Sequence, residues 1–136
     1  NQHPLSTRHH IRPDDLAGET LITYPVERER LDVFKQFLEP AGVEPAGVRT
    51  AEMTVMMMQL VASGRGVCCL PNWALAEYLH KGYVSACRLG PDGLFGTLYA
   101  AVREDMMTMP YLQDFLLTAK DTSFATLEGV SARGND

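Results

Sequence analysis

Two short apolar runs, each ended by a proline, constrain the fold of this chain more than any other feature. The first is Leu21-Ile22-Thr23-Tyr24 before Pro25, and the second is Val67-Cys68-Cys69-Leu70 before Pro71. Runs of this length that stop at a turn signal predict buried strands. The second run is apolar without alternation, which predicts a strand covered on both faces, as in a parallel sheet flanked by helices.

Helical patterns separate these runs. Segment 27–38 carries apolar residues at i, i+3 and i+7, which predicts an amphipathic helix, and segment 54–63 is apolar nearly all round. A helix of the second kind has to be buried on several sides. Asn72 is expected to cap a third helix that Gly82 closes.

The remaining segments are expected to continue this alternation. Thr108 is expected to cap a final helix with Pro110 in its first turn, and the tail from Thr122 is expected to be a loop whose last residues, 131–136, are disordered. Further strands are expected over 48–51, 83–89 and 96–102. This order predicts an α/β fold of three layers, in which a mostly parallel sheet lies between helices.

Composition excludes several classes of protein. The chain has 136 residues, 46% of them hydrophobic, which is typical of one ordinary domain or a piece of one. Its longest apolar stretch is far shorter than the roughly 20 residues of a membrane span, and no signal peptide is visible. The net charge of −5 does not attract phosphate backbones, so direct contact with DNA or RNA is not expected.

The residues that usually carry catalysis or bind metals form no recognisable constellation. The cysteines are Cys68, Cys69 and Cys87, an odd number without C-x-x-C spacing, which favours buried thiols in a reducing cytoplasm. No G-x-S-x-G motif is present, and no histidine stands beside a nucleophile and a carboxylate. We therefore predict no enzyme activity, no catalytic residue, no metal site and no cofactor.

Glycines and methionines each allow two interpretations. Gly64 and Gly66 follow a predicted helix and precede a strand, the reverse of a dinucleotide fingerprint, so they are expected to end the helix and to begin the strand tightly. The methionines of segment 53–58 are expected mainly in the core, with an adaptable ligand surface as the alternative. Those of segment 106–109 are expected to be half exposed, where a partner can pack on them.

Two strand-to-helix turns, 24–28 and 70–73, are built like ligand sites. In open α/β sheets ligands bind at the carboxyl ends of the strands, where helix N-termini present free N–H groups. An anionic group such as the carboxylate of an amino acid suits that geometry, and Arg28 or Arg30 can add a charged contact. Two ordinary turns are the alternative interpretation.

A family resemblance sharpens this interpretation. Residues 61–71 follow the pattern V-x-x-G-x-G-[apolar]-x-x-L-P between two predicted helices, which resembles a hallmark of LysR-type transcriptional regulators in their effector-binding domain. A narrower set of motifs resembles the members that regulate methionine biosynthesis genes, for which homocysteine is the effector. These motifs lie in 21–43, 70–73 and 98–103, and all the matching stretches together cover about 4–119.

The resemblance implies a place for this chain in a larger architecture. Family members carry an N-terminal winged helix-turn-helix, a linker helix and a two-lobed effector domain of the periplasmic-binding-protein type (type 2). We expect this chain to be the second lobe, with DNA contacted only through the missing winged helix-turn-helix of a cytoplasmic homodimer or tetramer. The expected parts are an inter-lobe segment (1–18), the effector-binding lobe (19–100), a return strand and C-terminal helix that pack on the absent first lobe (101–124) and a flexible tail (125–136).

The resemblance also implies where the effector binds. Three turns match cleft-lining turns of the family, and their residues are Pro25, Val26, Glu27, Arg28, Met53, Thr54, Leu70, Pro71 and Asn72. Met53 departs from the polar or acidic residue that similar family members often have before the threonine. The effector is expected to favour one arrangement of the lobes and so to shift how the DNA-binding heads are presented.

Three other functions fit the same scaffold. The chain can be a solute-binding protein of a transporter, which would normally be secreted and carry a signal peptide. It can be an enzyme, which would need a usable base at the strand ends, because fold does not fix function. It can also act mainly as a dimerisation module.

Overall fold

The computed structural model describes residues 3–132, which form two compact units. The first unit contains the chain up to Leu70 together with Ala74–Gly96. The second unit contains Pro71–Trp73 and the chain from Thr97 onward. Within the described residues, no helix is both long and apolar enough to cross a membrane.

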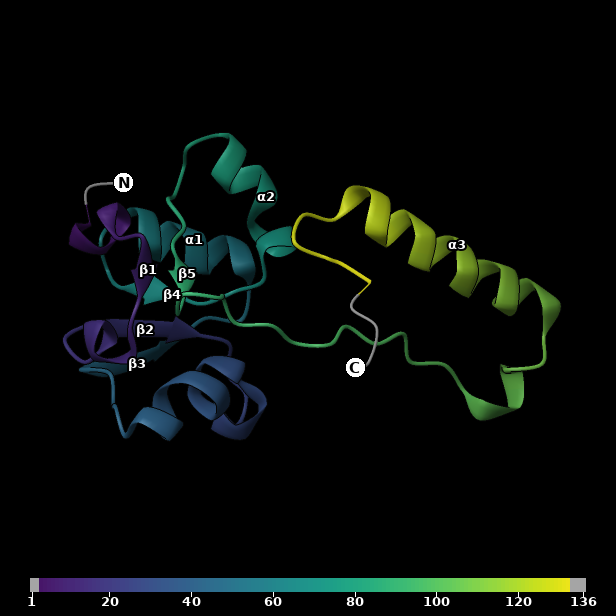
Figure 1. Ribbon diagram of the computed structural model, residues 1–136, viewed down its shortest axis with the longest axis horizontal. Helices are drawn as coiled ribbons and strands as arrows, with labels where there is room; N and C mark the ends of the chain where they lie inside the picture. The colour runs from purple at the N-terminus through teal and green to yellow at the C-terminus, as the bar shows by residue number, and fades with distance from the viewer. Residues whose placement is uncertain (1–2, 133–136) are drawn as a thin grey trace. The chain divides into compact units, whose positions relative to one another are not determined.

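A parallel sheet forms the centre of the first unit (Figure 1). Its middle strand is β2 (Thr20–Thr23), which pairs with β3 (Gly47–Thr50) on one side and with β4 (Val67–Cys68) on the other. All pairings are parallel, and Leu21 stands opposite Val48 in one strand and Val67 in the other. The buried strand predicted from the first apolar run is confirmed, whereas the second run forms a strand only over Val67–Cys68, and both of its residues are half-buried.

Neighbouring residues of β2 enter two different cores, which explains why Leu21 and Ile22 are both apolar. Leu21 and Ile22 are both fully buried, but they point to opposite faces of the sheet. The first core contains Ile11, Leu16, Leu21, Val33, Phe34 and Leu38. The second contains Ile22, Met57, Met58, Leu75 and Val84. Helical segments therefore cover both faces, which confirms the predicted three-layer arrangement.

The helical segments differ in regularity. The second core is covered by α1 (Thr54–Ala62) and α2 (Asn72–His80). The predicted helix over 27–38 is helical but divided, into the 3₁₀ turn η3 (Arg28–Arg30) and the π-helical η4 (Val33–Leu38), and the 3₁₀ turn η5 (Glu39–Ala41) follows it. Leu31 causes the first break because its backbone is extended, with φ −102° and ψ 108°.

A second, two-stranded parallel sheet joins β1 (His10–Ile11) to β5 (Arg88–Leu89). The amide of Gly90 extends the pairing by donating to the Ile11 carbonyl at 2.8 Å. The strand predicted over 83–89 is thus only two residues long. The strand predicted over 96–102 is wrong, because no strand of the described residues pairs with this segment and an unpaired strand leaves its backbone groups unsatisfied.

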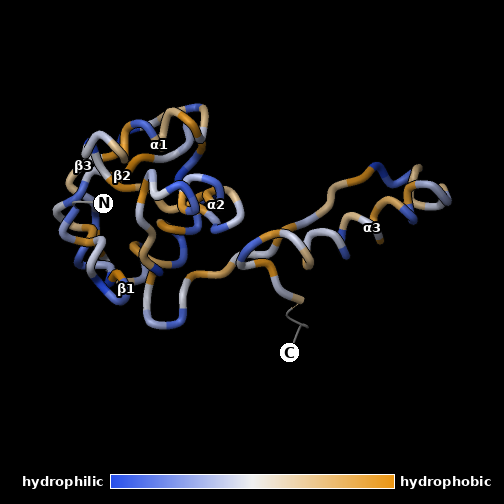
Figure 2. Tube along the Cα trace, turned by 90° about the horizontal axis from the view of Figure 1, so that it is seen from above, coloured by the Kyte–Doolittle hydropathy of each residue, from blue (hydrophilic) through white to orange (hydrophobic). Residues whose placement is uncertain are grey.

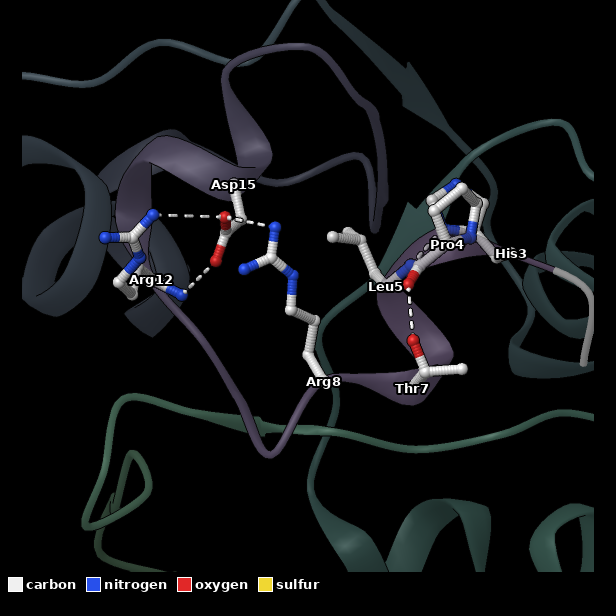
Figure 3. A network of polar contacts seen from close by, with 7 residues as sticks. All are labelled: His3, Pro4, Leu5, Thr7, Arg8, Arg12 and Asp15. Carbon is white, nitrogen blue, oxygen red and sulfur yellow. Dashed lines mark hydrogen bonds and ion pairs between the residues drawn. The ribbon is translucent and has the colours of Figure 1, made fainter.

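The carboxylate of Asp15 contacts both segments that flank β1, through Arg8 before the strand and Arg12 after it (Figure 3). Asp15 lies in η2 (Pro13–Leu16), which follows the short η1 (Pro4–Thr7). Its carboxylate accepts a hydrogen bond from the Arg12 amide at 2.9 Å and lies 3.5 Å from Nη2 of Arg8. The backbone hydrogen bond from Arg12, followed by the charges of Arg8 and Arg12, holds the pKa of this carboxyl below its ordinary value.

The second unit contains η6 (Glu104–Met106) and α3 (Pro110–Thr126). Two predictions are corrected here. The N-cap of α3 is Met109, not Thr108, and no side chain caps the helix. The tail is helical from Thr122 to Thr126, and the hydroxyls of Ser123 and Thr126 donate to carbonyls one turn earlier. The disorder predicted for 131–136 falls mainly outside the described residues.

Candidate functional site

The first predicted site turn follows β2 at the carboxyl edge of the sheet. Its residues Pro25, Val26 and Glu27 are exposed, and the Val26 amide donates to the Tyr24 carbonyl at 2.9 Å. Proline allows this tight reversal because its fixed φ ends the strand. The turn therefore presents an exposed surface directly beyond the strand that carries the core.

Arg28, the charged residue of this turn, is held by two carboxylates. Its guanidinium lies 2.6 Å from Oε1 of Glu44 and 3.3 Å from Oε1 of Glu39, and it stacks over the ring of Phe34. The hydrogen bond to Glu44 raises the pKa of Arg28 above its ordinary value. An anionic ligand has to compete with these carboxylates for Arg28. Arg30 pairs with Glu27 at 3.1 Å.

The second predicted turn joins β3 to α1 and is tied to β2 by hydrogen bonds. The hydroxyls of Tyr24 and Thr54 are 2.6 Å apart, and the Ala51 amide donates to the Thr23 carbonyl at 2.9 Å. These bonds hold the start of α1 against the end of the central strand. The sequence predicts Tyr24 only as the end of a strand, because its partner Thr54 lies 30 residues away in the chain.

A hollow of about 330 Å³ opens beside Thr54 and lies between the end of β3 and the first turns of α1. It is lined by Thr50, Ala51, Glu52, Met53, Met56 and Leu60. Met53 and Met56 are 59% and 53% exposed, whereas Met57 and Met58 are buried in the second core. The methionine cluster is thus divided between core and hollow. The expectation that α1 is buried on several sides is wrong, because one of its faces, with Val55 and Met56, is open.

The third predicted turn is divided between the two units. Leu70 ends the first part of the first unit and packs against the second core. Pro71 and Asn72 belong to the second unit, where both are exposed and Asn72 begins α2. The hydroxyl hydrogen bond therefore brings Thr54, next to Met53, together with Tyr24, whereas Pro71 and Asn72 belong to the second unit.

The glycines of the V-x-x-G-x-G pattern have the structural role that the sequence predicts. Gly64 takes φ +70° directly after α1, and Gly66 leads into β4. A Cβ at Gly66 would stand 2.3 Å from the Thr20 carbonyl oxygen, so only glycine allows β4 to lie this close to β2. The pattern therefore fixes the sheet rather than a phosphate group.

The neighbouring cysteines are unsuited to redox sensing. Burial raises the pKa of the Cys68 thiol to about 11 and that of Cys69 to about 12. Both thiols are protonated near neutral pH, whereas a reactive cysteine needs a lowered pKa and exposure. Within residues 3–132, no three His, Cys, Asp or Glu side chains are placed to hold a metal ion.

Comparison with known protein families matches residues 1–123 to the LysR substrate binding domain. The MetR transcriptional regulator of Haemophilus influenzae is 43% identical over 95% of this chain, and that of Escherichia coli K12 is 41% identical over 88%. The chain spans about two-fifths of the length of these relatives, 41% and 37% respectively. Both are named as HTH-type transcriptional regulators and not as enzymes.

A solved structure matches the fold as a whole. The regulatory domain of MetR from N. meningitidis, a LysR family regulator, superposes with a TM-score of 0.84 at 42% identity. The match covers 96% of this chain and 60% of that one. It confirms the predicted α/β fold, which agrees with a type 2 periplasmic-binding-protein-like domain.

Proposed function

We propose, from the premise that this chain belongs to the family of LysR substrate-binding domains, that it is one lobe of an effector-binding domain and senses an amino-acid-like metabolite. We further propose that the effector is homocysteine and that the parent protein controls methionine biosynthesis genes. The MetR name of the relatives supports this choice. The effector would contact the turns at Pro25–Arg28, Met53–Thr54 and Leu70–Asn72.

The start of α1 is the observation that carries the proposal. The amides of Met56 and Met57 donate to the Met53 carbonyl, while helix geometry leaves those of Thr54 and Val55 without an intrahelical acceptor. Together with the partial positive charge of a helix N-terminus, these N–H groups suit a carboxylate. The Tyr24–Thr54 hydrogen bond holds them in place.

The hollow supports an effector with a soft, apolar side chain. Met53 and Met56 present flexible thioethers beside the N–H groups of Thr54 and Val55. Thioethers adapt to irregular apolar shapes and make favourable contacts with polarisable atoms. A carboxylate at the helix start and a thiol-bearing chain in the hollow is the arrangement that homocysteine would adopt.

The parent protein would use this lobe as half of a switch. Effector bound between two lobes favours one lobe arrangement, which changes how the DNA-binding heads of a homodimer or tetramer are presented in the cytoplasm. DNA contact would belong to a winged helix-turn-helix outside this chain, in agreement with the net charge of −5. Residues 101–124 would pack on the first lobe.

An NMR titration with reduced L-homocysteine tests the proposal. Because this chain supplies only half of the cleft, we expect a Kd of about 1 mM or weaker, with amide shifts confined to the three turns and largest at Thr54, Val55 and Val26. Thr54→Val removes the Tyr24 contact and should abolish the shifts. Thr7→Val, on an exposed turn, is the matched control and should leave them unchanged.

Two outcomes would count against the proposal. Shifts of the same size and position with L-serine would remove the role of the sulfur-bearing side chain. Shifts elsewhere, or none at millimolar homocysteine, would remove this lobe from effector binding. Micromolar affinity of the chain alone would instead overturn the half-site argument.

A further inference from the structure

The start of α2 is grouped with the C-terminal segment of the chain and not with the rest of its own helix. Pro71–Trp73 belongs to the second unit together with Thr97 and the residues after it, while the helix from Ala74 onward belongs to the first. Within this stretch, Asn72 lies against Gly129 of the C-terminal segment. Asn72 is therefore the residue through which the C-terminal segment can affect the third site turn.

The contact at this point is between Asn72 and the turn that follows α3, residues 127–130. A Cβ at Gly129 would stand 3.2 Å from Nδ2 of Asn72 and 3.3 Å from its Cβ, so the glycine backbone lies directly against the side chain. Gly129 also has φ +79°, a conformation that residues with a Cβ rarely adopt. The turn can approach Asn72 this closely only with glycine at this position.

Backbone hydrogen bonds join the turn to α3. The amide of Leu127 donates to the Ser123 carbonyl inside the helix at 3.0 Å, and the Val130 amide closes the turn on the Leu127 carbonyl at 3.3 Å. Asn72 remains exposed, so the turn touches one side of its side chain and leaves the other open. A displacement of α3 thus changes what supports Asn72.

We propose that the turn at 127–130 is a latch through which α3 positions the side chain of Asn72. Asn72 is the residue whose side chain is positioned. Its contact with the effector rests on the proposed function. The latch itself depends only on the contact with Gly129. It links the C-terminal helix, whose own surroundings change when it packs on a partner surface, to a residue of the third site turn.

Trp73 provides a direct optical test because it is the one tryptophan of the sequence and is next to Asn72. It is 40% exposed, so acrylamide quenching of its fluorescence can rise or fall. Gly129→Ala in the 136-residue chain should lower the ratio of turns in contact with Asn72 to turns released from it by about 5- to 30-fold. The quenching constant of Trp73 should rise accordingly. A chain that ends at Thr126 should show the same increase.

Gly64→Ala is the matched control. Gly64 also has a positive φ, +70°, but a Cβ there meets nothing within 4 Å, so the backbone strain is similar and the Asn72 contact is untouched. It should leave Trp73 quenching unchanged. In an Asn72→Ala background, Gly129→Ala should have no further effect, a non-additivity that general loosening of the C-terminus would not produce.

No effector is added in this experiment, so its result does not depend on the identity of the effector. Unchanged quenching in both Gly129→Ala and the shortened chain would overturn the latch. An equal effect of Gly129→Ala with and without Asn72 would also overturn it, because the signal would then not pass through that side chain. The titration with homocysteine tests the proposed function separately.

Discussion

The two units differ in how they use their apolar residues. Every buried residue among those described lies in the first unit, where two cores cover opposite faces of one sheet. The second unit has a helix of 17 residues, α3, without a single buried side chain. Hydrophobic positions recur along α3 and the chain leading to it (Figure 2), and Tyr99, Phe115 and Leu117 are 81%, 64% and 62% exposed.

This difference separates two requirements for a stable fold. The first unit buries its apolar residues internally, because β2 contributes a residue to each core. The second unit has apolar residues like those of a packed helix, but they are exposed. Exposed apolar surface of this kind is typical of interaction sites. We propose that the first lobe covers it, the lobe on which residues 101–124 are expected to pack.

Matched phenylalanine substitutions give the largest expected contrast. Phe34 is 2% exposed, so Phe34→Ala should lower the free energy of unfolding by about 4 kcal/mol. Phe115 is 64% exposed, so Phe115→Ala should change it by less than about 0.5 kcal/mol. Urea unfolding followed by circular dichroism measures both, and equal losses would show that the second unit has a core of its own.

The glycine of the strand contact should have the next largest effect. Gly66→Ala places a methyl group 2.3 Å from the Thr20 carbonyl oxygen, which forces backbone movement and should cost about 3 kcal/mol in the free energy of unfolding. Gly18→Ala is the control, because a Cβ there meets nothing within 4 Å. If both variants unfold at the same urea concentration, β4 does not depend on this close approach.

The hydroxyl pair at the site should have a smaller effect on stability. Tyr24→Phe leaves the Thr54 hydroxyl without its partner at 2.6 Å and should cost about 1 kcal/mol. Tyr99→Phe, in the second unit, removes a hydroxyl from a side chain that is 81% exposed and should cost almost nothing. Thermal unfolding compares the two variants, and an unaffected Tyr24→Phe would mean that the pair does not hold the start of α1.

Cys68 of β4 and its neighbour Cys69 should show the smallest response near neutral pH. With the pKa of Cys68 raised to about 11 and that of Cys69 to about 12, about one thiol in a thousand or fewer is ionised at pH 8. Iodoacetamide should label neither in the folded chain and both after denaturation, as read by mass spectrometry. Rapid labelling of the folded chain would contradict a closed sheet.

The raised thiol pKa also gives the sign of a pH dependence. The folded state keeps these thiols protonated, so their contribution to stability is fully present below the ordinary cysteine pKa of 9.0. It is lost as the pH rises from 9.0 towards 11. Asp15 has the opposite sign, because its lowered pKa stabilises the fold above the ordinary value of 3.8 and that stabilisation is lost as the pH falls further.

The fold of the first unit could be predicted because local patterns and packing agree there. The run before Pro25 favours an extended strand, and Gly66 allows β4 to lie close to β2. The parallel sheet meets both requirements. The segment 96–102 could not be predicted in the same way. Its apolar residues indicate a strand, but a strand depends on a neighbour, and none pairs with it among the described residues.

The place of the candidate site in the fold could be predicted, but the contacts between its residues could not. Strand ends marked by Pro25 and Pro71 indicated two turns at the carboxyl edge, and the family resemblance added Met53 and Thr54. The structure pairs Tyr24 with Thr54 by a hydrogen bond. The partners of Arg28 could not be predicted, because Glu39 and Glu44 reach it only through the folding of η4 and η5. The nine-residue site itself stays a prediction.

Hydrogen–deuterium exchange of the α3 amides tests the central claim most directly, since exchange reports local opening. In this chain alone, α3 should exchange far faster than β2, because nothing buries its side chains. When the rest of the regulatory domain is added, exchange in α3 should slow while that of β2 stays unchanged. Equal protection of α3 and β2 in the chain alone would contradict the account.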